Sequence, residues 1–368
     1  MKRVRKKIIK IGNVKIGGNN PIAIQSMVKA DTRNVNAVIR QVKNLKSSGC
    51  DIVRIAVKDK ESAQAIACIK RKTDIPIVAD IHFSYELALL SIKNGADKIR
   101  LNPGNIYKKD EVRQVALAAA CAGIPIRVGL NSGSVGGVRN NRKRKNPRNC
   151  KTNNLMTTAA LSYIKMLEGF GFYNIVVSLK ASNILDTIYA YKEFSKKSNY
   201  PLHLGITATG FPRAGIIKSA IGIGALLLDG IGDTLRVSLT DDPCEEIIAA
   251  KDILCALNLR NFGPEIISCP TCGRCEVDLV NIVKDLEKKL LNSEARRYNK
   301  SSRVLSKPTK VAVMGCVVNG PGEAKDADLG IAFGKKSGLL FKKGKAFKKI
   351  KESQATKVIL KELNALIS

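Results

Sequence analysis

The feature that most constrains this chain is a regular alternation of short β-branched runs with segments of helical period. Several helical segments end at a glycine, as at Gly49, Gly95 and Gly123, which is the expected C-cap. Apolar strands that alternate with helices predict a parallel sheet. The eight strand candidates are "PIAIQSM" from Pro21, "CDIVRIAV" around Arg54, "IPIVADIHF" ending at Phe83, "DKIRLNPGN" around Arg100, "IPIRVGLNSGS" around Arg127, "YNIVVSLKAS" near Lys180, "YPLHLGITATG" with His203, and "GDTLRVSLT" with Arg236.

Eight βα units in about 230 residues favour an α/β fold of the TIM (β/α)8 type. An open doubly wound sheet is the alternative, because a strand count does not prove closure. A boundary follows the eighth unit, where Gly263 and Pro264 break the helical pattern. We therefore expect a barrel over residues 1–260 and a smaller α/β domain over 265–368. The second domain should hold a long charged helix, the strand "KVAVMGC", a Gly-rich loop, and a basic helical end.

Polar side chains lie late in the eight strands or just after them. In a TIM barrel this end carries the active site. Five of these side chains are cations, and the only acid among them is Asp80. Salt bridges at the rim of the barrel could therefore not account for all five cations with the acids of this set. Cations that converge on one place require a negatively charged partner, and the two N–H donors of a guanidinium match the oxygens of a phosphate. The predicted ligand is therefore a small polyanion, with a diphosphate favoured. The set comprises Arg54, Asp80, His82, Arg100, Asn102, Arg127, Asn131, Lys180, Thr207, Arg236 and Ser238.

The net charge of +32 admits two classes of protein, a nucleic-acid binder and an enzyme for a phosphorylated substrate. The charge is spread along the chain, and its densest run, Arg139 to Arg148, has no interleaved aromatic residues that could stack on bases. No apolar run reaches the roughly 18 residues of a membrane span, and no signal-peptide pattern follows the basic N-terminus. We expect a cytoplasmic enzyme without a nucleic-acid or membrane partner.

Three thiols crowd into "ISCPTCGRCEVDL", at Cys269, Cys272 and Cys275. A Cys-x-x-Cys pair can chelate a metal and also matches a redox pair. The stretch "GCVVNGPGEAKDADLGIA" adds Cys316 and Glu323 in a Gly-rich segment. The lack of a second Cys-x-x-Cys and of a nearby His argues against a zinc ribbon, whereas three thiolates and one exchangeable ligand suit an iron–sulfur cluster. Zinc and a metal-free role stay open at this point.

These stretches resemble, in order and along nearly the whole chain, the 4-hydroxy-3-methylbut-2-enyl diphosphate synthase family, the cluster-containing reductases of the non-mevalonate isoprenoid pathway. "IISCPTCGR" and "VAVMGCVVNGPGEAKDADLGIA" are its most specific motifs, and "QSMVKADTRN", "VADIHFSYELAL" and "GIGDTLRVSLT" also match. The resemblance implies a TIM barrel followed by an iron–sulfur domain, in a homodimer where the cluster domain of one subunit caps the barrel of the other.

The resemblance also implies an activity and a set of site residues. The activity is the reductive ring opening and dehydroxylation of 2-C-methyl-D-erythritol 2,4-cyclodiphosphate, with two electrons delivered through a [4Fe–4S] cluster. Flavodoxin or ferredoxin would donate them, and both are acidic, so the positive surface favours either. The implied cluster ligands are Cys269, Cys272, Cys316 and Glu323, and the implied catalytic residues are Glu323, His82 and Thr207. The implied substrate-binding residues are Arg54, Asp80, His82, Arg100, Arg127, Asn131, Lys180, Arg236, Ser238 and, beside the cluster, Asn319.

The chain departs from the family pattern at three places. Where the family reads Gly-Ile-Thr-Glu-Ala-Gly, Ala208 replaces its catalytic Glu, so we expect reduced turnover or a water or neighbour in that role. The loop over residues 139–148 is basic where the family is usually acidic, which could alter partner docking. Cys275 stands where the family commonly lacks Cys, and we expect a bystander thiol. The alternatives are therefore a catalytically weakened family member and, less favoured, a basic metal-binding nucleic-acid module.

Overall fold

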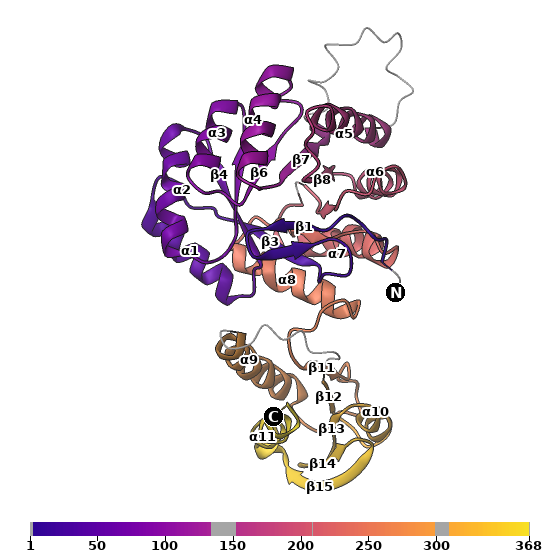
Figure 1. The fold of residues 1–368 in the computed structure, drawn as a ribbon. Coiled ribbons are helices and arrows are strands. Elements are labelled where there is room, and N and C mark those ends of the chain that lie inside the picture. Colours follow the sequence, from indigo (N-terminus) through magenta and orange to yellow (C-terminus); the bar gives the residue numbers. More distant parts are fainter. Residues whose placement is uncertain (1–2, 134–151, 208, 299–308, 368) are drawn as a thin grey trace. The chain divides into compact units, whose positions relative to one another are not determined.

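The computed structural model describes residues 3–133, 152–207, 209–298 and 309–367 (Figure 1). The chain divides into two compact units, Met1–Arg260 and Asn261–Ser368. Ala208 and the basic loop over residues 139–148 lie outside the described residues. Within the described ranges, no helix combines the length and the apolar character that crossing a membrane requires.

The core of the first unit is an eight-stranded parallel sheet with the order β8-β7-β6-β5-β4-β3-β10-β9. A parallel bridge between Val177 and Leu202 joins β8 to the start of β9 and so closes the sheet into a barrel. All eight predicted strands are present and the TIM barrel is confirmed, so the open-sheet alternative is wrong. The strands are β3 (Ala23–Met27), β4 (Ile52–Val57), β5 (Ile77–Ile81), β6 (Lys98–Leu101), β7 (Ile126–Asn131), β8 (Ile175–Lys180), β9 (His203–Leu204) and β10 (Thr234–Leu235).

A helix follows each barrel strand and covers it from outside (Figure 1). The side chains of Asn34 and Asp59 accept hydrogen bonds from the backbone N–H groups of Ala37 and Ser62, at the starts of α1 and α2. These N–H groups have no partner within the helix itself. Gly49 and Gly95, with positive φ, follow α1 and α3 as the expected C-caps. The helices are α1 (Val35–Ser47), α2 (Lys60–Lys72), α3 (Tyr85–Lys93), α4 (Lys109–Cys121), α5 (Thr152–Glu168), α6 (Ile184–Lys197), α7 (Pro212–Leu228) and α8 (Pro243–Ala256).

A hairpin that the sequence reasoning missed closes the amino-terminal end of the barrel. It consists of β1 (Ile9–Ile11) and β2 (Val14–Ile16), paired antiparallel. Its buried isoleucines pack against Ile52, Val78 and Val176, which lie at the starts of barrel strands. This apolar plug seals one end of the barrel, so the polar side chains late in the strands face an opening only at the other end.

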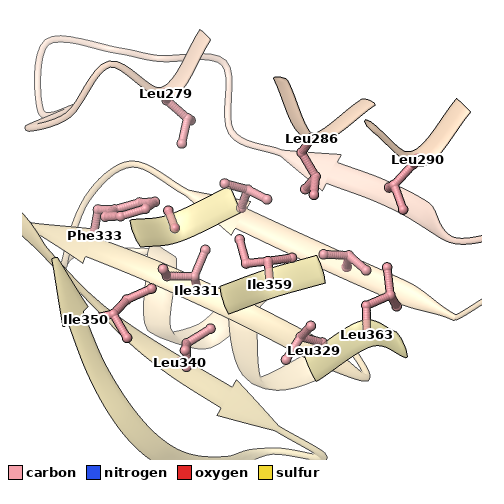
Figure 2. Packing of buried hydrophobic residues seen from close by; sticks show 13 residues of the cluster. Leu279, Leu286, Leu290, Leu329, Ile331, Phe333, Leu340, Ile350, Ile359 and Leu363 are labelled. Carbon is pink, nitrogen blue, oxygen red and sulfur yellow. The ribbon is translucent and has the colours of Figure 1, made fainter. Parts of the chain in front are cut away.

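The second unit is a five-stranded sheet with helices on both faces. Figure 2 shows Leu286 of α9 and Ile359 of α11 packed over Ile331 on one face. Ala324 of α10 packs with Ala332 on the other face. The strands are β11 (Glu265–Ser268), β12 (Lys310–Met314), β13 (Leu329–Gly334), β14 (Ser337–Lys342) and β15 (Lys345–Lys351), and the helices are α9 (Leu279–Tyr298), α10 (Gly320–Asp326), η2 (Glu352–Gln354) and α11 (Ala355–Ile367).

Two details expected for this unit are wrong. The Gly-rich segment is not all loop, because Pro321 in the first turn starts the short helix α10, which places Glu323 on a helix. The basic end is not all helical, because residues 337–351 form the antiparallel strands β14 and β15, and only α11 follows as a helix. Along β14, Leu340 belongs to the hydrophobic core on one face of the sheet and Phe341 to the core on the other, as expected for alternating side chains of a strand covered on both faces.

Candidate active site

A cavity of about 260 Å³ opens among the late ends of the barrel strands. Every barrel residue that the sequence reasoning assigned to catalysis or substrate binding lines it, although the roles of these residues stay predictions. Four further residues line the same cavity, and three of them, Asn105, Ser178 and Ile206, were not singled out. The predicted lining residues are Arg54, Asp80, His82, Arg100, Arg127, Asn131, Lys180, Thr207, Arg236 and Ser238, and Asn102 completes the set.

Two glycines make room for the long cationic side chains inside this narrow barrel. A Cβ atom on Gly129 of β7 would lie 2.6 Å from Nε of Arg100, and one on Gly205 would lie 2.5 Å from Nζ of Lys180. Real side chains do not approach so closely, so any larger residue would displace the cation. The Nη2 group of Arg100 also donates a hydrogen bond to the carbonyl oxygen of Gly129, at 2.9 Å.

Two of the five cations share one carboxylate. Asp80 lies 3.6 Å from Nε of Arg54 and 3.4 Å from Nη1 of Arg100. Burial alone would raise the pKa of Asp80, but Arg54, Arg100 and Arg127 outweigh burial and lower that pKa to about 2. Burial also lowers the pKa of Arg54 to about 10. The salt-bridge explanation is therefore correct for these two arginines, yet one carboxylate does not neutralise both.

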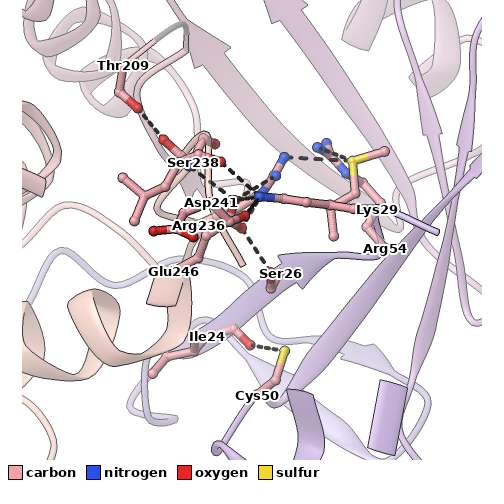
Figure 3. A network of polar contacts seen from close by, with 12 residues as sticks. Ile24, Ser26, Lys29, Cys50, Arg54, Thr209, Arg236, Ser238, Asp241 and Glu246 are labelled. Atoms are coloured by element: carbon pink, nitrogen blue, oxygen red, sulfur yellow. Dashed lines mark hydrogen bonds and ion pairs between the residues drawn. The ribbon is translucent and has the colours of Figure 1, made fainter. Parts of the chain in front are cut away.

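A third cation is paired with a carboxylate that the sequence reasoning missed. Glu246 of α8 is 1% exposed and lies 3.3 Å from both Nε and Nη2 of Arg236 (Figure 3). It also accepts hydrogen bonds from the Ser26 hydroxyl and the Leu239 backbone N–H, and Nζ of Lys29 lies 3.7 Å away. Glu246 sits in the first turn of a helix, where acids are common, so its spacing in the sequence gave no signal.

Arg127 and Lys180 have no ion pair with any described residue. Arg127 is 1% exposed, and its Nε and Nη1 atoms find no hydrogen-bond partner in the described part of the chain. Nζ of Lys180 has the ring of His203 as its neighbour, 3.4 Å from Nε2. Burial, and then the nearby Arg54, lower the pKa of both cations well below the ordinary values. Unpaired buried cations are costly, so their presence points to a ligand that carries negative charge.

The predicted cluster ligands lie in the second unit. Cys269 follows β11 and Cys316 follows β12, and these strands are parallel neighbours, so both cysteines lie at the same edge of the sheet. The pKa of the Cys272 thiol is lowered mainly by a hydrogen bond from the backbone N–H of Arg274. The pKa of the Cys316 thiol is lowered mainly by a hydrogen bond from the backbone N–H of Asn319. Thiols held in this way favour the thiolate form, which is the form that binds metals.

Glycine and the third thiol complete this arrangement. The Gly315 backbone N–H donates a hydrogen bond to Sγ of Cys269, at 3.3 Å, as expected where backbone approaches a thiolate closely. Cys275 differs in one contact, because its Sγ donates to the Val277 carbonyl oxygen at 3.3 Å, whereas Cys269 and Cys275 both pack against the hydrophobic core. No set of three or more His, Cys, Asp or Glu side chains within the described ranges is already gathered around one metal position. The donor types and their N–H partners nevertheless fit a soft, thiolate-bound centre.

The closed barrel and its cationic cavity define the class, an enzyme that takes a small polyanionic substrate at the carboxyl ends of its strands. Residues 6–251 match the GcpE TIM-barrel domain, and residues 265–365 match the GcpE protein C-terminal domain. The chain belongs to the GcpE family, which confirms the resemblance stated from the motifs.

Curated relatives extend over nearly the whole chain. The protein of Caldicellulosiruptor saccharolyticus is 51% identical and covers 98% of this chain and 99% of its own length. That of Caldanaerobacter subterraneus subsp. tengcongensis is 50% identical, with coverages of 98% and 96%. Both carry the name 4-hydroxy-3-methylbut-2-en-1-yl diphosphate synthase (flavodoxin). Among solved structures, a dihydropteroate synthase from Stenotrophomonas maltophilia matches with a TM-score of 0.51 at 15% identity, over 68% of this chain and 98% of its own, which shows a shared fold alone.

Proposed function

We propose that this protein converts 2-C-methyl-D-erythritol 2,4-cyclodiphosphate into 4-hydroxy-3-methylbut-2-enyl diphosphate in isoprenoid biosynthesis. The observation that carries the proposal is the cavity at the strand ends, in which five cations face Asp80 as the only carboxylate among the described lining residues. A cavity of about 260 Å³ lies near the small end of ligand sites, roughly 300–1,000 Å³, and so suits a compact substrate. The relatives of this name are about half identical to the chain over nearly their full length.

The two phosphates are the groups that we assign to the cations. Arg127 and Lys180 lack a carboxylate among the described residues, so a phosphate oxygen would supply their missing partner. Arg54 and Arg100 are held by Asp80 and keep donors free for a ligand. Because these guanidinium groups are already held in place, they lose little conformational freedom when the substrate binds. This favours tight binding and a fixed orientation of the cyclic substrate. His82, Asn131, Thr207 and Ser238 are proposed to contact the remaining polar groups of the substrate.

The proposed reaction requires only electrons and a proton besides the substrate. One ring C–O bond breaks so that the diphosphate stays on a single carbon, and one hydroxyl leaves as water. Counted as a dianionic substrate and a trianionic product, the conversion consumes two electrons and one proton. We propose His82, Thr207 and Lys180 as the lining residues closest to the proton transfer, although the hydroxyls of Ser178 and Ser238 line the cavity as well. Glu323 is the acidic catalytic residue that we propose from the second unit.

The proposed cofactor is a [4Fe–4S] cluster held by Cys269, Cys272, Cys316 and Glu323. When bound, such a cluster passes electrons one at a time to the substrate. Glu323 is exposed on α10, and a carboxylate is the most readily exchanged member of this set. We leave Cys275 out of the set, and its hydrogen bond to the Val277 carbonyl oxygen supports this choice. Asn319, whose N–H bonds Cys316, is proposed to lie beside both cluster and substrate.

The assembly is a further part of the proposal. None of the described residues that line the barrel cavity is a cysteine, so the second unit of this or another chain must bring the cluster to the substrate. We propose a homodimer in which the cluster domain of one subunit caps the barrel of the other. Flavodoxin, which the names of the relatives contain, is the proposed electron donor, with ferredoxin as the second candidate. We place the enzyme in the cytoplasm, where thiols stay reduced.

The cluster is tested by purifying the protein without oxygen and measuring iron, sulfide, zinc and visible absorbance. Brown protein with about four irons per chain is expected. Cys316→Ser should lose the iron and Cys275→Ala should keep it, since only the first is a proposed ligand. Colourless protein with stoichiometric zinc would defeat the cluster assignment. In a separate assay, Ala208→Glu should raise the turnover, and an unchanged rate would show that Ala208 is not a catalytic weakness.

A further inference from the structure

A strongly basic hairpin forms one edge of the sheet in the second unit. Residues 335–351 contain eight lysines and no acidic residue. Lys342 pairs with Glu362 at 3.4 Å, whereas the other seven lysines are exposed and make no ion pair with a described residue. We call this segment the basic hairpin. Glu352 follows Lys351 directly and Glu276 lies beside Gly334, so these two acids offset only part of the charge, and the remainder can attract an acidic surface.

One end of the basic hairpin lies beside the thiols. β11, β12 and β13 run parallel, so their carboxyl ends lie side by side. The turn after β13 therefore lies next to Cys269 and Cys316, which follow β11 and β12. A Cβ atom on Gly334, the last residue of β13, would lie 3.1 Å from Cγ1 of Val317. Lys335 and Lys336 form the turn after Gly334 and thus flank the segment that carries Cys316. We call this the cluster end.

The same register places other lysines at the cluster end or away from it. Ser337 pairs with Lys351, which brings Lys351 to the cluster end, while Lys342 pairs with Lys345 at the opposite turn. Lys343 and Lys345 therefore carry the same charge at the far end of the same hairpin. This gives the molecule an internal control for position.

Two exposed apolar side chains follow Cys316, and the first of them lies beside the turn that carries Lys335 and Lys336. Val317 and Val318, which follow Cys316 directly, are 61% and 60% exposed. A small apolar spot with a charged rim is typical of weak, rapidly exchanging interfaces between proteins, including those of electron carriers. The charge supplies steering toward the site, and the apolar contact excludes water close to the thiols.

We propose that Lys335, Lys336 and Lys351, around Val317 and Val318, form the docking surface for an acidic one-electron carrier protein. The proposal rests on the function proposed above and names the place where its electrons enter. Two successive encounters each oxidise one reduced carrier by one electron, which gives the two electrons of a turnover, and no bond forms or breaks at the surface. A nucleic acid is the less suited occupant, because Phe347 is the only aromatic residue exposed on the basic hairpin.

The test measures binding of purified flavodoxin, as the acidic probe, to the full-length protein by calorimetry at two salt concentrations. The double variant Lys335→Glu with Lys336→Glu reverses two charges at the cluster end. The matched control is Lys343→Glu with Lys345→Glu at the far end. Lys336 and Lys343 both have positive φ, 53° and 48°, so each double variant carries the same backbone strain. We expect affinity to fall at least about tenfold in the first variant and less than about twofold in the control.

Turnover driven by a small chemical reductant is measured in parallel and should be equal in the wild type and both variants. Equal loss of affinity in the two double variants, or no loss in either, would overturn the proposed location. Tighter binding of a short single-stranded RNA than of flavodoxin, lost in the cluster-end variant, would also overturn it. Absence of turnover in the wild type with the chemical reductant counts against the proposed function instead, because the binding measurement does not depend on it.

Discussion

Glu246 and Arg236 come from a barrel helix and the end of a barrel strand, and two contacts of 3.3 Å join their side chains. The carboxylate is almost fully buried, and Ser26 and Leu239 occupy its remaining acceptor positions. Such a carboxylate fixes the guanidinium before any ligand arrives, because a bidentate pair restricts both rotation and translation. Glu246 thus holds Arg236, which lines the cavity, in one orientation.

Glu246→Gln should weaken substrate binding more than it slows the chemical step. Arg236 loses the charge that orients it, so we expect KM to rise about tenfold, equivalent to roughly 1.4 kcal/mol, with a smaller change in kcat. Steady-state kinetics of both parameters check this. Ser26→Ala removes one hydrogen bond to the same carboxylate and keeps the ion pair, so its KM should stay near that of the wild type. An equal effect of the two substitutions would show that Glu246 acts only through packing.

Arg127→Met should weaken substrate binding and stabilise the ligand-free protein. Its buried guanidinium forms no ion pair with a described residue and has only the attraction of the more distant Asp80, so removing it should raise the free energy of unfolding of the ligand-free protein by about 1 kcal/mol or more. Arg236→Met is the matched contrast, because it leaves the buried Glu246 with only the more distant Lys29, at 3.7 Å, as a cationic partner and should destabilise by roughly 3–5 kcal/mol. Thermal unfolding measures both changes, and both variants should bind substrate poorly. Destabilisation by Arg127→Met would show that this cation has a partner in the free protein.

Substrate binding should take up protons through Lys180. Burial, and then Arg54, Arg127, Arg236 and Arg100, lower the pKa of Lys180 well below 10.5, so above that lowered value the free amine is neutral. A bound diphosphate stabilises the ammonium and raises this pKa, so affinity should fall as the pH rises through that interval. Calorimetry in two buffers of different ionisation enthalpy counts the protons. Proton release on binding would contradict the assignment.

The buried His203 titrates in the same direction and has to be separated from Lys180. Its pKa is lowered by burial first and by Lys180 second, and its Nδ1 lies 2.8 Å from the Thr234 hydroxyl. Lys180→Met keeps His203 in place and removes the amine. If Lys180 is the acceptor, this variant should lose most of the proton uptake. Unchanged uptake in the variant would assign the proton to His203.

Asp80→Asn should change stability in a pH-dependent manner. The pKa of Asp80 is about 2 in the folded protein and 3.8 is its ordinary value, so the carboxylate stabilises the fold fully above about pH 4 and loses this contribution as the pH falls toward 2. At pH 7 the variant leaves Arg54 and Arg100 without their shared partner and should lose roughly 3–5 kcal/mol. Denaturant unfolding across this range should show the difference shrinking with acidity. A constant difference would mean that Asp80 acts through shape alone.

The sequence predicted the barrel and most of its cavity because both follow from local rules. Strand and helix periods identify βα units, and a polar residue late in a strand faces the cavity whatever its neighbours are. The hairpin of β1 and β2 was missed because it is short and lies outside the repeating pattern. α10 was missed because Gly320 and Gly322 weaken helix propensity, which Pro321 in the first turn and the packing of Ala324 offset.

Partnerships between distant residues could not be predicted in the same way. Glu246 reaches Arg236 because α8 packs back on the barrel, and no spacing in the sequence records that contact. The lack of a carboxylate beside Arg127, among the residues that the structure describes, is also a property of the folded interior. The basic hairpin could be counted as lysines, but its neighbourhood to Val317 follows only from the parallel order of β11, β12 and β13.

The most direct test of the account is conversion of the cyclodiphosphate by anaerobic, iron-containing protein with reduced flavodoxin, followed by phosphorus NMR. We predict that the signals of the cyclic substrate give way to those of a linear diphosphate, with two electrons consumed per molecule. Arg127→Met and Cys316→Ser should each abolish most of the conversion, one through binding and the other through the cofactor. Persistence of the cyclic substrate with iron-loaded wild-type protein, under either flavodoxin or a chemical reductant, would contradict the proposed function.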